Sequence, residues 1–151
     1  MITSEEVESA ADEPRAAAGV DVSVGVDLVE VTRLARLAAE PAGLVGVLTE
    51  RELEYCGRQR RPAEHMAARF AAKEAVLKAF GVGVAKGIRW TDVEILKRQG
   101  GGPTVALHGA VASLAAQRGL RRLEISLSHT AALAVAHAVA LWAEPSEPDS
   151  L

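Results

Sequence analysis

Hydrophobic and polar residues alternate along the segment VDVSVGVDLVEV, residues 20–31. Successive side chains of a strand point to opposite faces, so one face of this segment is apolar: Val20, Val22, Val24, Val26 and Leu28. The other face carries Asp21, Ser23, Gly25 and Asp27. We predict a strand with one buried face. Aspartate is depleted in strands, so Asp27 stands out in this segment. Because the face that carries Asp27 becomes apolar at Val29, its carboxylate is expected at a boundary between polar and apolar surface.

A helical pattern follows in residues 62–80. At about 100° per residue, four apolar side chains share one arc of the helix: Met66, Phe70, Leu77 and Phe80. We therefore expect this helix to lie on a core. Lys73 falls within the arc, and Glu74 and Lys78 lie one turn apart on its flank. From the helix alone, these charges are equally well explained as an exposed salt-bridged face whose lysine stems extend along apolar surface.

Shorter patterns predict the remaining elements: a helix at 32–39, a capping-box helix at 49–55, a hairpin of strands 90–97 and 104–107, a helix at 108–118 and a strand at 123–130. The apolar run 131–142 is compatible with helix or strand by its period. The order of strand, helices, hairpin, helix and a last strand predicts an α+β domain with a mainly antiparallel sheet.

Length and composition favour one soluble domain. The 151 residues are enough for one core, which we place at residues 20–143, between acidic tails at 1–19 and 144–151 that we expect to be disordered. No apolar run approaches the roughly 18 residues of a membrane span, and the start of the chain is acidic, unlike a secretory leader. The sequence therefore predicts a cytoplasmic protein without a membrane partner. The single cysteine, Cys56, can form no internal disulfide and lacks zinc-site companions.

The net charge of −3 conceals a basic body. Eight of the 20 acidic residues and one of the 17 basic residues lie in the tails, so the rest of the chain carries a net charge of about +4. Such a surface suits a polyanionic cofactor or an acidic protein partner. It is too weakly basic, and at 3% aromatic residues too poor in stacking side chains, for a nucleic-acid-binding protein.

Three segments, VSVGVDLVEV at 22–31, RFAAKEAVLKAF at 69–80 and LEISLSHT at 123–130, occur in this order. Together they resemble the signature blocks of the holo-acyl-carrier-protein synthase family of 4′-phosphopantetheinyl transferases, over residues 22–141. The resemblance implies a ferredoxin-like phosphopantetheinyl transferase fold, with a mainly antiparallel sheet packed on a long central helix. It also implies that the run 131–142 pairs as a hairpin with the preceding strand, and that the protein is a homotrimer with each active site at a subunit boundary.

The same resemblance implies roles for individual residues. Asp27 and Glu74 match the positions that hold the divalent metal, Mg²⁺ or Mn²⁺. Other matching positions are expected to contact coenzyme A: Arg69, Lys73, Lys78, His129 and Thr130. For Lys73, a structural ion pair is an equally good interpretation. The helix at 32–39 matches the one that faces the acyl carrier protein, which makes Arg33 and Arg36 candidate contacts for an acidic partner.

The family transfers 4′-phosphopantetheine from coenzyme A to a serine of an apo acyl carrier protein, for fatty-acid or polyketide synthesis. Phosphoryl transfer requires mainly charge neutralisation and alignment of the nucleophile, and magnesium uses only one or two protein carboxylates. Asp27, Glu74 and Lys78 are accordingly the expected catalytic residues, with Glu74, or a water that it orients, accepting the serine proton.

Two other functions stay open at this point. In a non-catalytic α+β binding module, Asp27, Glu74 and Lys78 would form a buried ion-pair cluster. In a metal-dependent nucleotide hydrolase, the same carboxylates would act on water and cleave coenzyme A without a carrier protein. Both explain the charged helix but leave the other two sequence blocks without a reason.

Overall fold

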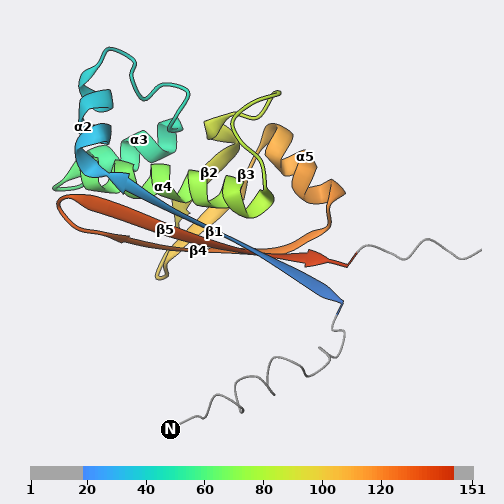
Figure 1. Cartoon of the computed structure of the whole chain (residues 1–151). Helices are drawn as coiled ribbons and strands as arrows, with labels where there is room; N and C mark the ends of the chain where they lie inside the picture. Colours follow the sequence, from blue (N-terminus) through green and yellow to red (C-terminus); the bar gives the residue numbers. More distant parts are fainter. Residues whose placement is uncertain (1–18, 145–151) are drawn as a thin grey trace, which may run out of the picture.

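The computed structural model describes residues 19–144 (Figure 1). The predicted disorder of the tails falls on residues 1–18 and 145–151, outside the described part. The elements in chain order are β1 (Val20–Glu30), α2 (Val31–Ala39), α3 (Glu50–Gly57), α4 (Pro62–Phe80), the 3₁₀ helix η1 (Trp90–Asp92), β2 (Val93–Lys97), β3 (Pro103–Leu107), α5 (Gly109–Gln117), β4 (Leu120–His129) and β5 (Leu133–Ala143). The expected α+β class is confirmed.

The strands form two antiparallel sheets. One has the order β1-β5-β4 and the other pairs β2 with β3. The ambiguous run at 131–142 is a strand, because it closes a hairpin with β4 and also pairs with β1 along its length. The predicted strand at 90–97 was wrong at its start: residues 90–92 form η1, where the Asp92 carboxylate accepts a hydrogen bond from the Arg89 N–H.

The long helix α4 lies between the three-stranded sheet and a second layer that contains α2, α3 and the β2–β3 hairpin (Figure 1). Its ends follow from its sequence. Pro62 occupies the first turn, where a missing N–H is tolerated, and Gly81 ends the helix with a left-handed φ of 68°. The prediction that this helix lies on a core is confirmed, because it is buried on nearly all sides.

Small residues bring α4 close to the sheet. The inner face of β5 is lined by Ala134, Ala136, Ala138 and Ala140, all fully buried. On β1, a Cβ atom at Gly25 would lie 1.9 Å from the Ala75 carbonyl oxygen, closer than any side chain can approach. Gly25 therefore permits direct packing of the β1 backbone on the backbone of α4.

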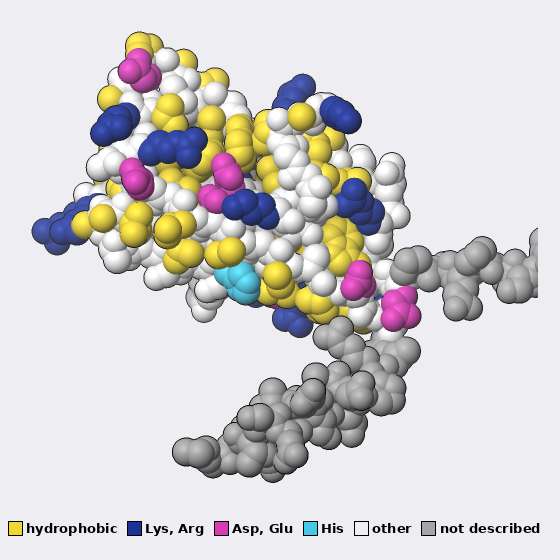
Figure 2. Space-filling view, viewed as in Figure 1, with side chains coloured by type: hydrophobic (Ala, Val, Ile, Leu, Met, Phe, Trp, Pro, Cys, Tyr) yellow, Lys and Arg dark blue, Asp and Glu magenta, His cyan; other side chains and the backbone are white. Residues whose placement is uncertain are grey.

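The strand pattern of β1 is confirmed, but its orientation is the reverse of what apolar burial suggests. The polar face, with Ser23, Gly25 and Asp27, packs on α4. The apolar face is the exposed one, with Val22, Val24, Val26 and Leu28 exposed by 53–62%. Hydrophobic side chains gather in a band along this side of the sheet (Figure 2). A contiguous apolar band on the outside is typical of a surface at which another molecule binds.

None of the helices in the described part of the chain is long and apolar enough to cross a membrane.

Candidate active site

The charged residues of α4 lie on two different flanks of the helix. Arg69 and Glu74 are five residues apart, which at 3.6 residues per turn separates their directions by about 140°. Glu74 and Lys78 are on the flank near β1. Arg69 is on the other flank, where α3 and the β2–β3 hairpin lie.

On the first flank, Asp27 and Lys78 form an ion pair. The Lys78 ammonium donates to Asp27 Oδ1 at 2.9 Å and to the Val26 carbonyl oxygen at 3.1 Å. The Asp27 side chain is only 14% exposed, whereas that of Lys78 is 54% exposed. The hydrogen bond from Lys78 to Asp27 raises the pKa of the lysine, so Lys78 is a cation at neutral pH. The structure thus brings together two residues that lie 51 positions apart in the sequence.

Glu74 completes this group. Its pKa is raised, first by partial burial and then by the negative charge of Asp27, against the opposing charges of Lys78 and Arg33. Two carboxylates that repel each other at the helix–sheet junction are a suitable donor set for a hard divalent cation. Among the described residues, no group of three or more His, Cys, Asp or Glu side chains is placed to hold a metal. The two carboxylates suffice for magnesium only if water and substrate oxygens complete the coordination.

Both arginines of α2 are exposed, and α2 packs beside α4. The Arg33 guanidinium lies over the Phe70 ring at 5.3 Å and acts electrostatically on Glu74. Arg36 occupies the last turn of α2. The candidate partner surface therefore adjoins the carboxylates.

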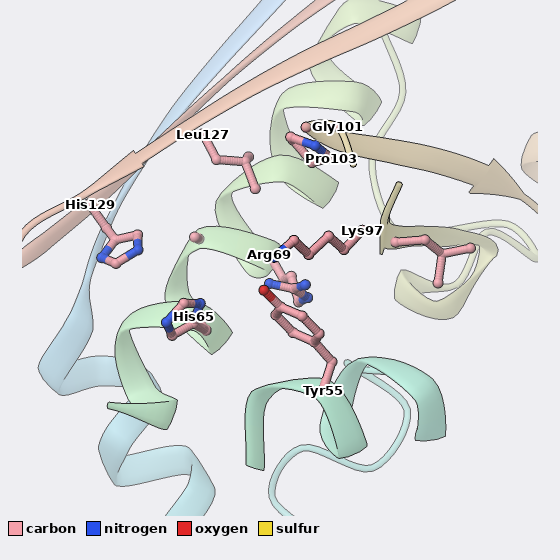
Figure 3. A pocket seen from close by; sticks show the side chains of 11 residues that line it. Tyr55, His65, Arg69, Lys97, Gly101, Pro103, Leu127 and His129 are labelled. Carbon is pink, nitrogen blue, oxygen red and sulfur yellow. The ribbon is translucent and has the colours of Figure 1, made fainter. Parts of the chain in front are cut away.

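On the second flank is a cavity of about 190 Å³ (Figure 3). It is lined by α3, α4, the β2–β3 hairpin and β4, through residues that include Tyr55, His65, Arg69, Lys97, Pro103 and His129. Arg69 is 5% exposed, and the centre of its guanidinium lies 4.0 Å from the centroid of the Tyr55 ring. Two of the predicted coenzyme A contacts, Arg69 and His129, thus line one cavity.

The imidazoles of this cavity are held by neighbouring groups. His129 Nδ1 lies 3.1 Å from Glu64 Oε2, and the His65 and His129 rings meet edge to face at 5.0 Å. Burial lowers the pKa of His65, and the charges of His129 and Arg69 lower it further. The Thr130 hydroxyl accepts hydrogen bonds from the backbone N–H groups of Ala132 and Leu133, so it organises the β4–β5 turn.

Lys73 does not line this cavity. Its side chain is fully buried, its ammonium lies 2.7 Å from the equally buried carboxylate of Glu52, and it also donates to the Trp90 and Val93 carbonyl oxygens. Burial lowers the pKa of Lys73, with Glu52 opposing the shift. Of the two interpretations given to Lys73, the geometry favours the structural ion pair over a coenzyme A contact.

A second buried carboxylate continues this network. Glu94 accepts hydrogen bonds from Thr49 and Arg51 and lies 3.0 Å from His108 Nε2. Burial alone would raise the pKa of Glu94, but these partners outweigh it and lower the pKa to about 2. Glu52 itself closes the predicted capping box of α3 with Thr49 and also accepts from the Ile95 N–H. The network ties α3, α4 and β2 together.

Three of the cavity residues with polar or charged side chains were not predicted from the sequence: Tyr55, His65 and Lys97. For His65 a signal existed, because it precedes Arg69 by four residues and so shares its helix face. Tyr55 and Lys97 reach the cavity from other elements, and only the tertiary fold places them there. Cys56, next to Tyr55, is fully buried, and this burial raises its pKa to about 11, so the thiol stays protonated.

The two flanks are separated by the body of the domain. Asp27 on β1 and Leu127 on β4 share one row of the sheet, with Ala136 of β5 between them. Two strand spacings amount to about 10 Å, and α4 packs over the middle strand. Within one chain, the carboxylate group and the cationic cavity therefore face different directions.

Comparisons with known proteins point to one family. A family profile described as "4'-phosphopantetheinyl transferase superfamily" matches residues 23–136. Two relatives named holo-[acyl-carrier-protein] synthase, from Desulforudis audaxviator and Moorella thermoacetica, are 49% and 43% identical over 83% and 78% of this chain, and the matches span 95% and 92% of those proteins.

Among solved structures, an ACPS–CoA complex from Chronobacterium ammoniagenes superimposes with a TM-score of 0.70 at 29% identity, covering 80% of this chain and 96% of that one. The profile, the relatives and the fold agree over most of the described residues. The chain belongs to the holo-acyl-carrier-protein synthase family within the 4′-phosphopantetheinyl transferase superfamily.

Proposed function

We propose that this protein transfers 4′-phosphopantetheine from coenzyme A to a serine of an apo acyl carrier protein. The products are the holo carrier protein and adenosine 3′,5′-bisphosphate. The observation that carries the proposal is the cluster of Asp27, Glu74 and Lys78 at the junction of β1 and α4, in a member of this family. Its conversion of a carrier protein would serve fatty-acid or polyketide synthesis in the cytoplasm.

In the reaction, the serine oxygen attacks the phosphorus that bears the pantetheine arm, and the bond from this phosphorus to the bridging oxygen of the pyrophosphate breaks. Glu74, or a water that it orients, is the candidate acceptor of the serine proton, because its carboxylate lies beside Asp27 and Lys78 at the junction of β1 and α4. Lys78 stabilises negative charge on the departing bisphosphate, since its ammonium is exposed beside Asp27. Asp27 and Glu74 would hold magnesium or manganese, which when bound neutralises charge on the pyrophosphate.

The cavity on the other flank is the proposed site for the phosphate-bearing adenosine end of coenzyme A. Arg69 supplies a buried cation, and His129 is oriented by Glu64, which leaves its Nε2 free for the ligand. Thr130 follows His129 and stays a candidate contact, although its hydroxyl already serves the turn.

A complete site then requires two subunits, because the two flanks face different directions within one chain. We propose a homotrimer in which Asp27, Glu74 and Lys78 of one subunit face Arg69 and His129 of the next. The exposed apolar band of β1 supports this assembly, since valine side chains more than half exposed are costly to leave in water. Arg33 and Arg36 would receive the acidic carrier protein beside the carboxylates.

Intact-protein mass spectrometry tests the reaction directly. A panel of apo carrier proteins is incubated with the protein, coenzyme A and magnesium, in parallel with the Glu74→Ala variant and with an EDTA control. We expect a phosphopantetheine-sized mass gain that falls by at least about 100-fold in rate for Glu74→Ala. Cleavage of coenzyme A without carrier would favour the hydrolase. No gain on any carrier, with coenzyme A intact, would favour the binding module.

A further inference from the structure

Arg69 is a buried cation that has no acidic partner among residues 19–144. It is 5% exposed, and no carboxylate of the described residues lies within ion-pairing distance of its guanidinium. Its Nε atom is buried and has no hydrogen-bond partner in the described part of the chain. An uncompensated buried charge is expensive, so a residue held in this state has a function that an internal ion pair would abolish.

The group that faces this cation is an aromatic ring. The Arg69 guanidinium lies 4.0 Å from the centroid of Tyr55 (Figure 3). A guanidinium over a ring is stabilised through the ring face, and its N–H groups, which lie in its plane, stay available at the edge. A carboxylate would also stabilise the cation, but it would occupy those donors and cancel the charge.

Tyr55 is itself firmly placed. It lies on α3, whose first turn is fixed by the Thr49–Glu52 capping box and by the buried pair of Glu52 with Lys73. Its ring also approaches that of His65, with centroids 6.1 Å apart. The buried network therefore holds the ring against which Arg69 rests.

We propose that Tyr55 is a positioning residue for substrate binding: its ring holds the buried Arg69 guanidinium in the cavity with its charge uncompensated and its donors free for a phosphate group. This inference rests on the proposed function only in taking that phosphate to belong to coenzyme A. It assigns to α3 a part in binding that its sequence did not indicate.

The test is calorimetric binding of adenosine 3′,5′-bisphosphate to the full chain, with the wild type compared with Tyr55→Phe, Tyr55→Leu and Arg69→Lys. Tyr55→Phe keeps the ring face, so we expect affinity within about twofold of the wild type. Tyr55→Leu removes the ring face, and we expect a loss of about tenfold. Thermal melts identify any variant that fails to fold, and Tyr55→Met replaces Tyr55→Leu in that case.

A double-mutant cycle separates positioning from general packing. Lysine keeps the charge at residue 69 but cannot stack as a plane, so Tyr55→Leu should cause less than about a twofold further loss in the Arg69→Lys background. This coupling, together with rescue by Tyr55→Phe, is the result that supports the inference.

Two results would overturn the inference about Tyr55, and only the second would also overturn the proposed function. If the wild type binds the bisphosphate, Arg69→Lys weakens it and Tyr55→Leu binds like the wild type, then Tyr55 has no positioning role and the proposed function stands. If the wild type binds neither the bisphosphate nor coenzyme A, both the inference and the proposed function fail.

Discussion

Lys73 and Lys78 lie five residues apart on α4, each beside a carboxylate from another element, yet their surroundings differ in kind. The Lys73–Glu52 pair has no exposed side-chain surface, and its ammonium also meets two backbone carbonyl oxygens. The Lys78–Asp27 pair leaves more than half of the lysine side chain in water. Both lysines occur in the family block, so the motif alone does not separate them.

The difference shows how one motif serves two purposes. A buried pair with all its hydrogen bonds made has no capacity left for a ligand, but its loss would leave a charge stranded in the core. An exposed lysine beside a largely buried carboxylate adds little to stability and can exchange that partner for a phosphate. The motif thus contributes a buried structural ion pair on one flank and, on the other, an exposed charge that we propose meets the substrate.

The largest effect is expected from Lys73→Met. This change leaves the buried Glu52 carboxylate without its cation, and we expect the free energy of unfolding to fall by about 3–5 kcal/mol in denaturant titrations. Adding Glu52→Gln should recover part of the loss, because the amide is neutral and its oxygen still accepts a hydrogen bond. A loss below about 1 kcal/mol for Lys73→Met would remove the distinction between the two lysines.

Lys78→Met should have a small effect on stability and a large effect on the rate of transfer. Because the ion pair is exposed on the lysine side, the free energy of unfolding should change by less than about 1 kcal/mol. The rate of phosphopantetheine transfer should fall by about 100-fold, since the charge that stabilises the leaving group is gone. Lys78→Arg, which keeps the charge, is the matched control. A variant that is active but unstable would contradict the assignment.

A smaller effect is expected from the protonation of His65 on the second flank. The pKa of His65 is lowered by burial and then by His129 and Arg69, with Glu64 opposing and Lys97 contributing slightly. The folded protein therefore binds this proton less tightly than the unfolded chain, and the contribution of His65 to stability is lost as the pH falls below about 6.5.

An anion in the cavity favours the protonated imidazole, so binding of adenosine 3′,5′-bisphosphate should take up protons near pH 6. The ligand phosphates also take up protons in this range, so the informative quantity is the difference in proton uptake between the wild type and His65→Phe. When the pH is lowered from 7.5 to 6, we expect the affinity of the wild type for the bisphosphate to increase about threefold more than that of the variant. Calorimetry in buffers of different ionisation enthalpy measures the proton uptake, and identical uptake by both proteins would rule out His65.

Local patterns predicted most of the fold because the signals that decide each element are local. The Thr49–Glu52 capping box, the helix from Pro62 to Phe80 and the alternation of β1 all appear where expected. Local patterns did not predict which face of β1 packs on the helix. The valine face of β1 lies outside because alanines of β5 and Gly25 give α4 a closer fit to the other face, and no period in the sequence reports that fit.

The candidate site divides in the same way. Residues within the family blocks, such as Asp27 and Glu74, were identified by position, and the structure brings them together. The outcome for Lys73 could not be decided, because its partner Glu52 comes from α3 and the sequence does not show which helices touch. For the same reason Tyr55 and Lys97 went unnoticed, since they reach the cavity from α3 and β2.

The absence of a side chain at Gly25 has a consequence for the chemistry. Because the backbones of β1 and α4 touch there, the distance between strand and helix is set by main-chain atoms, which cannot change rotamer. Asp27 lies two residues along the same face of β1, and Glu74 precedes the helix residue that Gly25 contacts. The distance between the two carboxylates is therefore set by the contact between the two backbones. A single methyl group at residue 25, which carries no charge, would therefore change the distance between the two carboxylates of the proposed site.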